Sequence, residues 1–220
     1  MFNVIFSDPH VPFSREDRSI AERICADTAM ELRDLLPALP GVVQIQIANH
    51  GRVIPQLGYG ARATTMDSVS FVVDPEHAKG SAILMQEHLR PSLFHECHHL
   101  VRGWVLRGGR PPRRFIDGVI HEGLASAFER DAAGHASPWT RYPSEVANWV
   151  DELLALPVTA PYADWMFFHP DGRRWIGYRA GVFIADRAIA ASGFAAAELV
   201  HSSSEEILAL ADIPSPPVLH

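Results

Sequence analysis

The chain of 220 residues lacks the features that mark secreted or membrane-spanning proteins. It contains two cysteines, Cys25 and Cys97, which are too few for a disulfide framework and are typical of a reducing compartment. It has no run of about 18 apolar residues, the length that a transmembrane helix needs. The N-terminal segment MFNVIFSDPHVPF has no positively charged region and no cleavage site of small residues. We therefore expect a cytoplasmic protein with no membrane partner.

Positive charge is also scarce. Lysine and arginine together number 19 against 26 aspartates and glutamates, which gives a net charge of −7, and Lys79 is the only lysine. Nucleic-acid-binding proteins usually have the opposite balance, so we expect no nucleic-acid partner. The motifs GxxxxGK[ST], GxGxxG and GxSxG are absent, which argues against a phosphate-binding loop, a dinucleotide site and an α/β-hydrolase.

Patterns typical of strands come early in the chain, and helical patterns dominate later. Strand patterns occur at 2–6, 42–48, 53–57 and 69–73, whereas the glycine-rich segment 58–65 is expected to be irregular. Helical spacing of apolar residues occurs at 15–36, 81–89, 91–105, 115–132, 144–156, 176–191 and 205–211. This order favours an α+β fold, with a small antiparallel sheet packed on helices and a mostly helical C-terminal lobe. We expect one domain over 1–220, with lobes at 1–135 and 136–220.

The strongest functional signal is the motif His95-Glu96-Cys97-His98-His99, which lies in an apolar helical segment. Successive residues of a helix turn by about 100°, so His95 and His99 lie about 40° apart on one face. Two imidazoles at this spacing can bind one zinc ion, and Glu96, offset from both, can act on a water molecule as a general base.

His98 offers an alternative partner for His95, because these two residues are three positions apart. In that pairing Glu96 would lie about 160° from His98 and point away from the metal. We therefore prefer His95 and His99 as the ligands, and we expect His98 to support a ligand or to face solvent.

A third ligand is indicated by Glu122, which follows in the sequence HEGLAS at 121–126. It lies in the next helical segment, so a helix, a loop and a second helix could complete a site of two histidines and one glutamate. The small residues Ala125 and Ser126 would let the two helices approach closely. An isolated glutamate on a helix is usually exposed, but the surrounding helix here has the composition of a buried one.

With these residues the chain resembles the gluzincin metallopeptidases and, more closely, the YjaZ-like predicted zinc-dependent proteases. The matching segments are HECHHLVRG at 95–103, EGLASAFER at 122–130 and GYRAGVFIADR at 177–187, and the similarity spans roughly residues 40–210. The resemblance implies a zincin-like fold with Zn²⁺ as cofactor. It also implies roles for five residues: His95, His99 and Glu122 as zinc ligands, Glu96 as the general base, and Tyr178 as a hydrogen-bond donor to the developing oxyanion.

One position departs from the family pattern. Many gluzincins have an aspartate four residues after the third ligand, where it orients a zinc-bound histidine, but this chain has Ser126 there. The orienting acceptor is then Glu129, Asp117 or a backbone carbonyl.

The sequence therefore predicts a zinc-dependent metallopeptidase in which Glu96 activates a zinc-bound water. Its expected substrate is a peptide or an unfolded protein, held in extended form along an edge strand of the sheet, for which Val69–Val73 is the candidate. Two alternatives keep the zinc site. One is a non-catalytic, chaperone-like protein that recognises extended chains, and the other is a zinc hydrolase of a small amide.

Overall fold

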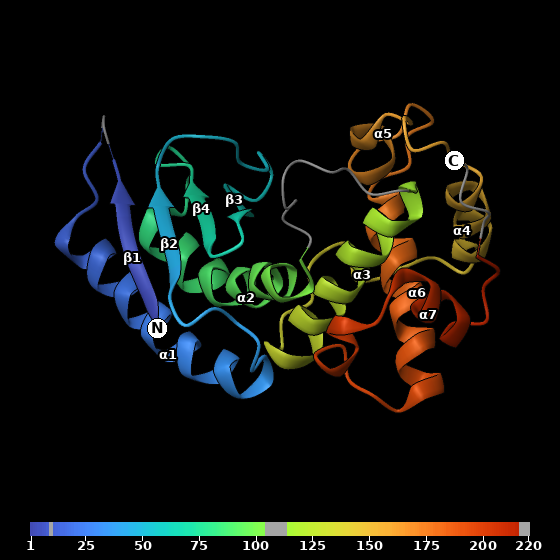
Figure 1. Cartoon of the computed structure of the whole chain (residues 1–220). Helices are drawn as coiled ribbons and strands as arrows, with labels where there is room; N and C mark the ends of the chain where they lie inside the picture. The colour runs from blue at the N-terminus through green and yellow to red at the C-terminus, as the bar shows by residue number, and fades with distance from the viewer. Residues whose placement is uncertain (9–10, 104–113, 216–220) are drawn as a thin grey trace. The chain divides into compact units, whose positions relative to one another are not determined.

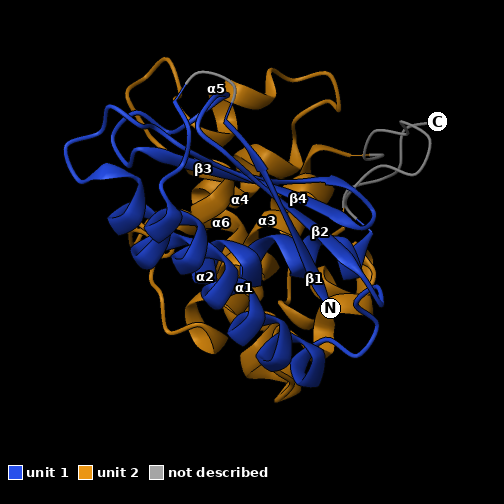
Figure 2. Ribbon diagram, turned by 90° about the vertical axis from the view of Figure 1, so that its left-hand side faces the viewer, with its two compact units in different colours: residues 1–107 blue, residues 108–220 orange. Residues whose placement is uncertain are grey.

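The structure is a computed structural model that describes residues 1–8, 11–103 and 114–215 (Figure 1). The chain divides into two compact units, residues 1–107 and 108–220 (Figure 2). Helices and strands are both present, which confirms the α+β class in its broad form. In the described residues the elements follow in the order β1 (Phe2–Ser7), α1 (Arg15–Leu35), β2 (Val43–Ala48), β3 (Tyr59–Thr65), β4 (Ser68–Val73), α2 (Gly80–Arg102), α3 (Phe115–Ala132), α4 (Val146–Leu154), α5 (Tyr162–Met166), α6 (Ile176–Ser192), a 3₁₀-helix (Glu198–His201) and α7 (Ser204–Leu210).

The sheet of the first unit is mixed, with the strand order β1-β2-β4-β3. β1 and β4 each pair with β2 in parallel, and only β3 is antiparallel to its neighbour β4. The prediction of an antiparallel sheet is therefore wrong. The cause is the position of α1 between β1 and β2, because a crossover helix returns the chain to the same end of the sheet and makes the joined strands parallel.

The strand at the edge of the sheet is also not the one that was predicted. Val69–Val73 lies in β4, which is an interior strand between β2 and β3, so it does not supply an edge. Its nearly continuous apolar run is buried. The segment expected to be irregular instead forms the edge strand β3. The predicted strand at 53–57 is limited to a single bridge between Ile54 and Tyr59.

The alternating pattern of β2 determines which face of the sheet is covered. Val43, Ile45 and Ile47 are fully buried, whereas Gln44 and Gln46 on the opposite face are exposed. α1 and α2 lie side by side on one side of the strands (Figure 2). The period of two in this strand thus gives a one-sided helical layer over the sheet.

α1 begins at the predicted residue, and its first turn is capped by a reciprocal pair of hydrogen bonds. The Ser14 hydroxyl accepts from the Asp17 N–H at 3.0 Å, and the Asp17 carboxylate accepts from the Ser14 N–H at 2.9 Å. These bonds satisfy two backbone donors that the helix cannot satisfy itself.

α2 is one continuous helix where two were predicted. Pro91 lies inside it and removes one backbone donor, which normally interrupts a helix. Every residue from Pro91 to Leu100 is buried, and this packing outweighs the lost hydrogen bond. The helix ends at Arg102, and the predicted end at Val105 lies outside the described residues. Within the described ranges, no helix combines the length and the hydropathy that a membrane span requires.

The second unit is organised around α6, which contacts α3, α4, α5 and α7. α3 and α6 cross at two glycines so closely that a Cβ on Gly123 would lie 2.1 Å from the backbone of Gly181. The same pair of helices is joined by Arg130, which donates to the Asp186 carboxylate at 2.8 Å. The segments 122–130 and 177–187 are therefore packing partners.

Replacing Gly181 by alanine is expected to lower the free energy of unfolding by about 1–3 kcal/mol, because the new Cβ would overlap backbone atoms of α3. Its ideal position lies 2.2 Å from the carbonyl oxygen of Val119. Gly177→Ala is the matched control on the same helix, since its Cβ would meet the side chain of Met166, which can move. Urea denaturation of the full chain measures both variants, and equal stabilities would contradict the close crossing.

Candidate metal centre and its surroundings

The two histidines of the HExxH motif point their ring nitrogens at each other. The Nε2 atoms of His95 and His99 are 3.1 Å apart, and the two rings are inclined at 78°. Both side chains are buried, with 8% and 3% of their surface exposed. Two nitrogens bound to one tetrahedral zinc ion at 2.0–2.1 Å are about 3.3 Å apart, so the observed spacing fits a shared metal ion.

Glu96 is held by the edge strand of the sheet. Its Oε2 accepts a hydrogen bond of 2.7 Å from the backbone N–H of Ala63 in β3. The Tyr59 carbonyl of β3 accepts from the Ile54 N–H, which lies outside the sheet, so Tyr59 points its backbone groups away from β4. Alternate residues of a strand point their backbone groups to the same side. Ala61 and Ala63 therefore direct their backbone groups away from β4, and Glu96 lies beside this outer side of the strand.

The other two residues of the motif are buried side chains. His98 is fully buried, which excludes the solvent-facing alternative, and a role in supporting a ligand stays a prediction. Cys97 is also fully buried, and burial raises the pKa of its thiol far above its ordinary value. The protonated thiol is a poor metal ligand, since zinc binds the thiolate.

Glu122 lies on α3 in the second unit and is buried, with 7% of its surface exposed. The hydroxyl of Tyr162, on α5, lies 3.5 Å from Glu122 Oε1, which is a long hydrogen bond. The ring of Tyr162 is 6.0 Å from the ring of Phe115, at the start of α3. A carboxylate buried in an apolar helix needs such polar neighbours or a cation, because burying an unpaired charge is costly.

The acceptors proposed to orient a zinc-bound histidine have partners within the second unit. The Glu129 carboxylate accepts from the Ser137 hydroxyl at 2.7 Å. The Asp117 carboxylate accepts from the Arg114 guanidinium at 2.7 Å. Ser126 is fully buried.

Tyr178 lies in the first turn of α6 and is half-buried. Its ring packs between those of Trp139, at 5.3 Å, and Phe167, at 6.1 Å. These contacts hold the tyrosine in one orientation, and its catalytic role stays a prediction.

The predicted ligands are suited to zinc in chemistry and burial. His95 and His99 each offer an imidazole nitrogen and Glu122 offers a carboxylate oxygen, and all three side chains are buried. Two histidines and one glutamate are a donor set that catalytic zinc sites use.

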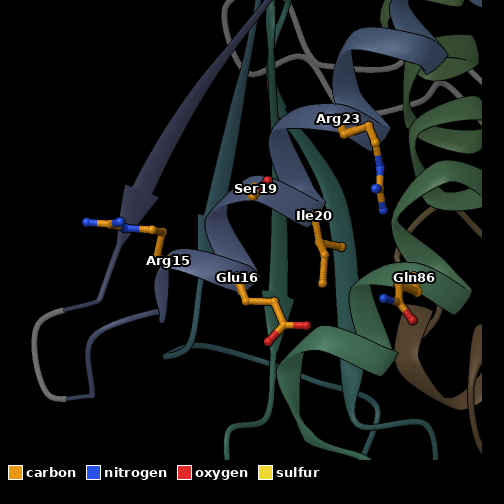
Figure 3. A pocket seen from close by; sticks show the side chains of 6 residues that line it. All are labelled: Arg15, Glu16, Ser19, Ile20, Arg23 and Gln86. Atoms are coloured by element: carbon orange, nitrogen blue, oxygen red, sulfur yellow. The ribbon is translucent and has the colours of Figure 1, made fainter.

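A surface pocket lies between α1 and α2 of the first unit (Figure 3). Figure 3 shows the Arg15 guanidinium directed away from the other lining side chains. Gln86, which lines the pocket from α2, precedes His95 by nine residues, or about 14 Å along the helix axis. The pocket is thus separate from the histidine pair. It is lined by Arg15, Glu16, Ser19, Ile20, Arg23 and Gln86.

Two groups at this candidate centre were not predictable from the sequence. Tyr162 lies 40 residues after Glu122 in a segment rich in proline and aromatic residues, and no spacing links the two. The Ala63 N–H is a backbone group in a segment that was expected to be irregular. The sequence held one indication of such a donor, the glutamate of the motif, because a buried carboxylate requires a hydrogen-bond donor.

Comparison with known proteins gives one match. The family model described as Predicted Zn-dependent protease (DUF2268) matches residues 22–209, a range that includes the motif, Glu122 and Tyr178. No curated protein and no solved structure matches the chain. The family is described as zinc-dependent, which agrees with the cofactor expected from the donor set. The match confirms the resemblance drawn from the three sequence segments, and the chain belongs to the DUF2268 family of predicted Zn-dependent proteases.

Proposed function

We propose that this chain is a zinc metallopeptidase that hydrolyses peptide bonds, with His95, His99 and Glu122 as zinc ligands and Glu96 as the general base. One observation carries the proposal. On a single helix, two imidazole nitrogens converge at 3.1 Å while the glutamate between them is bound to the open edge of the sheet. That arrangement brings a metal-binding pair and a proton acceptor to the place where an extended chain could bind.

The residues have distinct roles in this proposal. When bound, the zinc ion supplies Lewis-acid activation of the scissile carbonyl and of a water molecule. The Glu96 carboxylate takes a proton from the attacking water and later transfers it to the leaving amine. The Ala63 N–H orients that carboxylate through Oε2. The Tyr178 hydroxyl donates a hydrogen bond to the oxygen on which negative charge develops.

The proposed substrate is an extended peptide or an unfolded protein segment. β3 is the edge strand, and the backbone groups of Ala61 and Ala63 face away from β4. A substrate chain could add to this edge by backbone hydrogen bonding. We also infer a zincin-like fold, supported by the position of the HExxH helix under an antiparallel edge strand. A cytoplasmic location is supported by Cys25 and Cys97, which are free buried thiols.

Glu96→Gln is expected to bind zinc as the native chain does and to lose peptide hydrolysis by about 100-fold or more, because the amide cannot accept the proton. Cleavage of a library of unstructured peptides by the zinc-loaded chain measures the activity. Glu87→Gln is the matched control, since Glu87 is an exposed glutamate on the same helix. If the native chain binds zinc and extended peptides without cleaving them, the chaperone-like alternative replaces the protease.

Glu122→Ala is expected to weaken zinc binding by at least about 100-fold, because one of three protein ligands is lost. Elemental analysis after dialysis against a competing chelator measures the bound zinc per chain. His98→Ala and His121→Ala are made in parallel and should retain the metal. Zinc retained by Glu122→Ala but lost from one of these histidine variants would assign the third ligand to that histidine.

Ala63→Pro removes the N–H that binds Glu96, and it breaks no ladder bond because that N–H faces away from β4. We expect kcat to fall by about 10-fold to 100-fold, since the general base loses its orientation. Ala61→Pro is the matched control on the same side of β3. It should leave kcat nearly unchanged and raise KM if the substrate pairs with this edge. Equal kcat values for the two variants would contradict an orienting role of the Ala63 N–H.

A further inference from the structure

The second unit presents a group of aromatic side chains at its surface around α5. Tyr162 is 39% exposed and Phe167 is 42% exposed. Their ring centroids are 6.3 Å apart, and the ring of Phe167 lies 6.1 Å from that of Tyr178. Phe167 thus neighbours both the tyrosine that reaches Glu122 and the tyrosine proposed to contact the oxyanion.

The backbone that carries Phe167 is fixed. Its N–H donates to the carbonyl of Ala163 at 2.9 Å, and its carbonyl accepts from the N–H of Trp175 at 3.2 Å. Met166, the preceding residue, is fully buried and fills the space beside Gly177 of α6. A large apolar ring held at the surface by a fixed backbone is typical of a binding site.

This aromatic group is continuous with the proposed ligand Glu122 through Tyr162. The Tyr162 hydroxyl lies 3.5 Å from Glu122 Oε1, and the centroid of the same ring is 6.3 Å from that of Phe167. Tyr162 therefore neighbours both Phe167 and the proposed zinc ligand, and this one side chain bridges the separation between them. An extended peptide advances by about 3.3–3.6 Å per residue, so a side chain one or two residues from the scissile bond spans that separation.

We propose that Tyr162 and Phe167 form a specificity subsite that binds a bulky apolar side chain of the peptide substrate, one or two residues from the bond that is cleaved. This inference rests on the proposed function and adds the substrate preference. Aromatic rings offer flat apolar surface that an aliphatic or aromatic side chain can cover, whereas a charged or small polar side chain gains little there.

The neighbouring Phe168 does not offer the same surface, although it is 55% exposed. The Arg174 guanidinium lies 4.8 Å above its ring, so one face is already covered by a cation. Phe167 is therefore the residue to change.

The test compares two peptides that differ only in having phenylalanine or serine next to the scissile bond. Binding of uncleaved peptide is measured by fluorescence anisotropy with the zinc-loaded Glu96→Gln chain, and cleavage is measured with the native catalytic residue. Adding Phe167→Ala should weaken binding of the phenylalanine peptide by roughly 10-fold and change that of the serine peptide by less than about 2-fold. Phe167→Leu, which keeps an apolar side chain, should restore most of the affinity.

Phe194→Ala is the matched control. Phe194 is 53% exposed and follows the far end of α6, about 25 Å along the helix from the first turn that holds Tyr178. This variant should affect neither peptide. Equal losses for both peptides with Phe167→Ala, or no loss for either, would overturn the subsite.

Two further outcomes separate the subsite from the activity on which it rests. If the native chain cleaves peptides without preferring the phenylalanine peptide, the subsite is wrong and the protease stands. If the zinc-loaded chain cleaves no peptide and the Glu96→Gln chain binds none, both fail. A change in molar mass by light scattering on Phe167→Ala, with peptide binding unchanged, would instead make this surface an interface between copies of the chain.

Discussion

The ionisable side chains buried within five residues of one helix set the main constraint on the first unit. His95, Glu96 and His99 lie in a stretch of α2 where every residue is buried, and taking a carboxylate out of water costs several kcal/mol unless it is paired. The structure meets this cost with short contacts, from one imidazole to the other and from the Ala63 N–H to Glu96. A helix selected for stability alone would carry apolar residues here, so the polar group indicates a function.

The mixed sheet provides the support and one of the hydrogen bonds for these buried side chains. A parallel core of β1, β2 and β4 supports α2 on one face, and the antiparallel β3 brings an outward-facing backbone donor to the motif. If β3 were an interior strand, its N–H groups would be used by a neighbour and Ala63 could not reach Glu96. The edge position therefore gives Glu96, the proposed general base, its hydrogen-bond partner.

In the second unit, two glycines allow two helices to pack closely. Gly123 follows the proposed ligand Glu122 directly, and its contact with Gly181 brings α3 and α6 together. Tyr178 lies on α6 one turn before that crossing. The crossing therefore sets the spacing between the helix that carries the carboxylate and the helix that carries the tyrosine.

Local patterns in the sequence predicted the local features well. The apolar period and the Ser14 cap located α1, and the spacing of the two histidines predicted that they share one face of a helix. Features that depend on distant segments were not predictable in this way. The direction of a strand is decided by the segment that connects it to its neighbour. At Pro91, the burial of the surrounding residues outweighed the lost backbone hydrogen bond. Tyr162 meets Glu122 only through the packing of α5.

A crystal structure of the zinc-loaded chain, with anomalous scattering recorded at the zinc absorption edge, tests the central claim most directly. We predict one peak per chain, bound by the Nε2 atoms of His95 and His99 and by a carboxylate oxygen of Glu122, at about 2.0–2.2 Å from each. A peak bound elsewhere, or a third ligand other than Glu122, would contradict it.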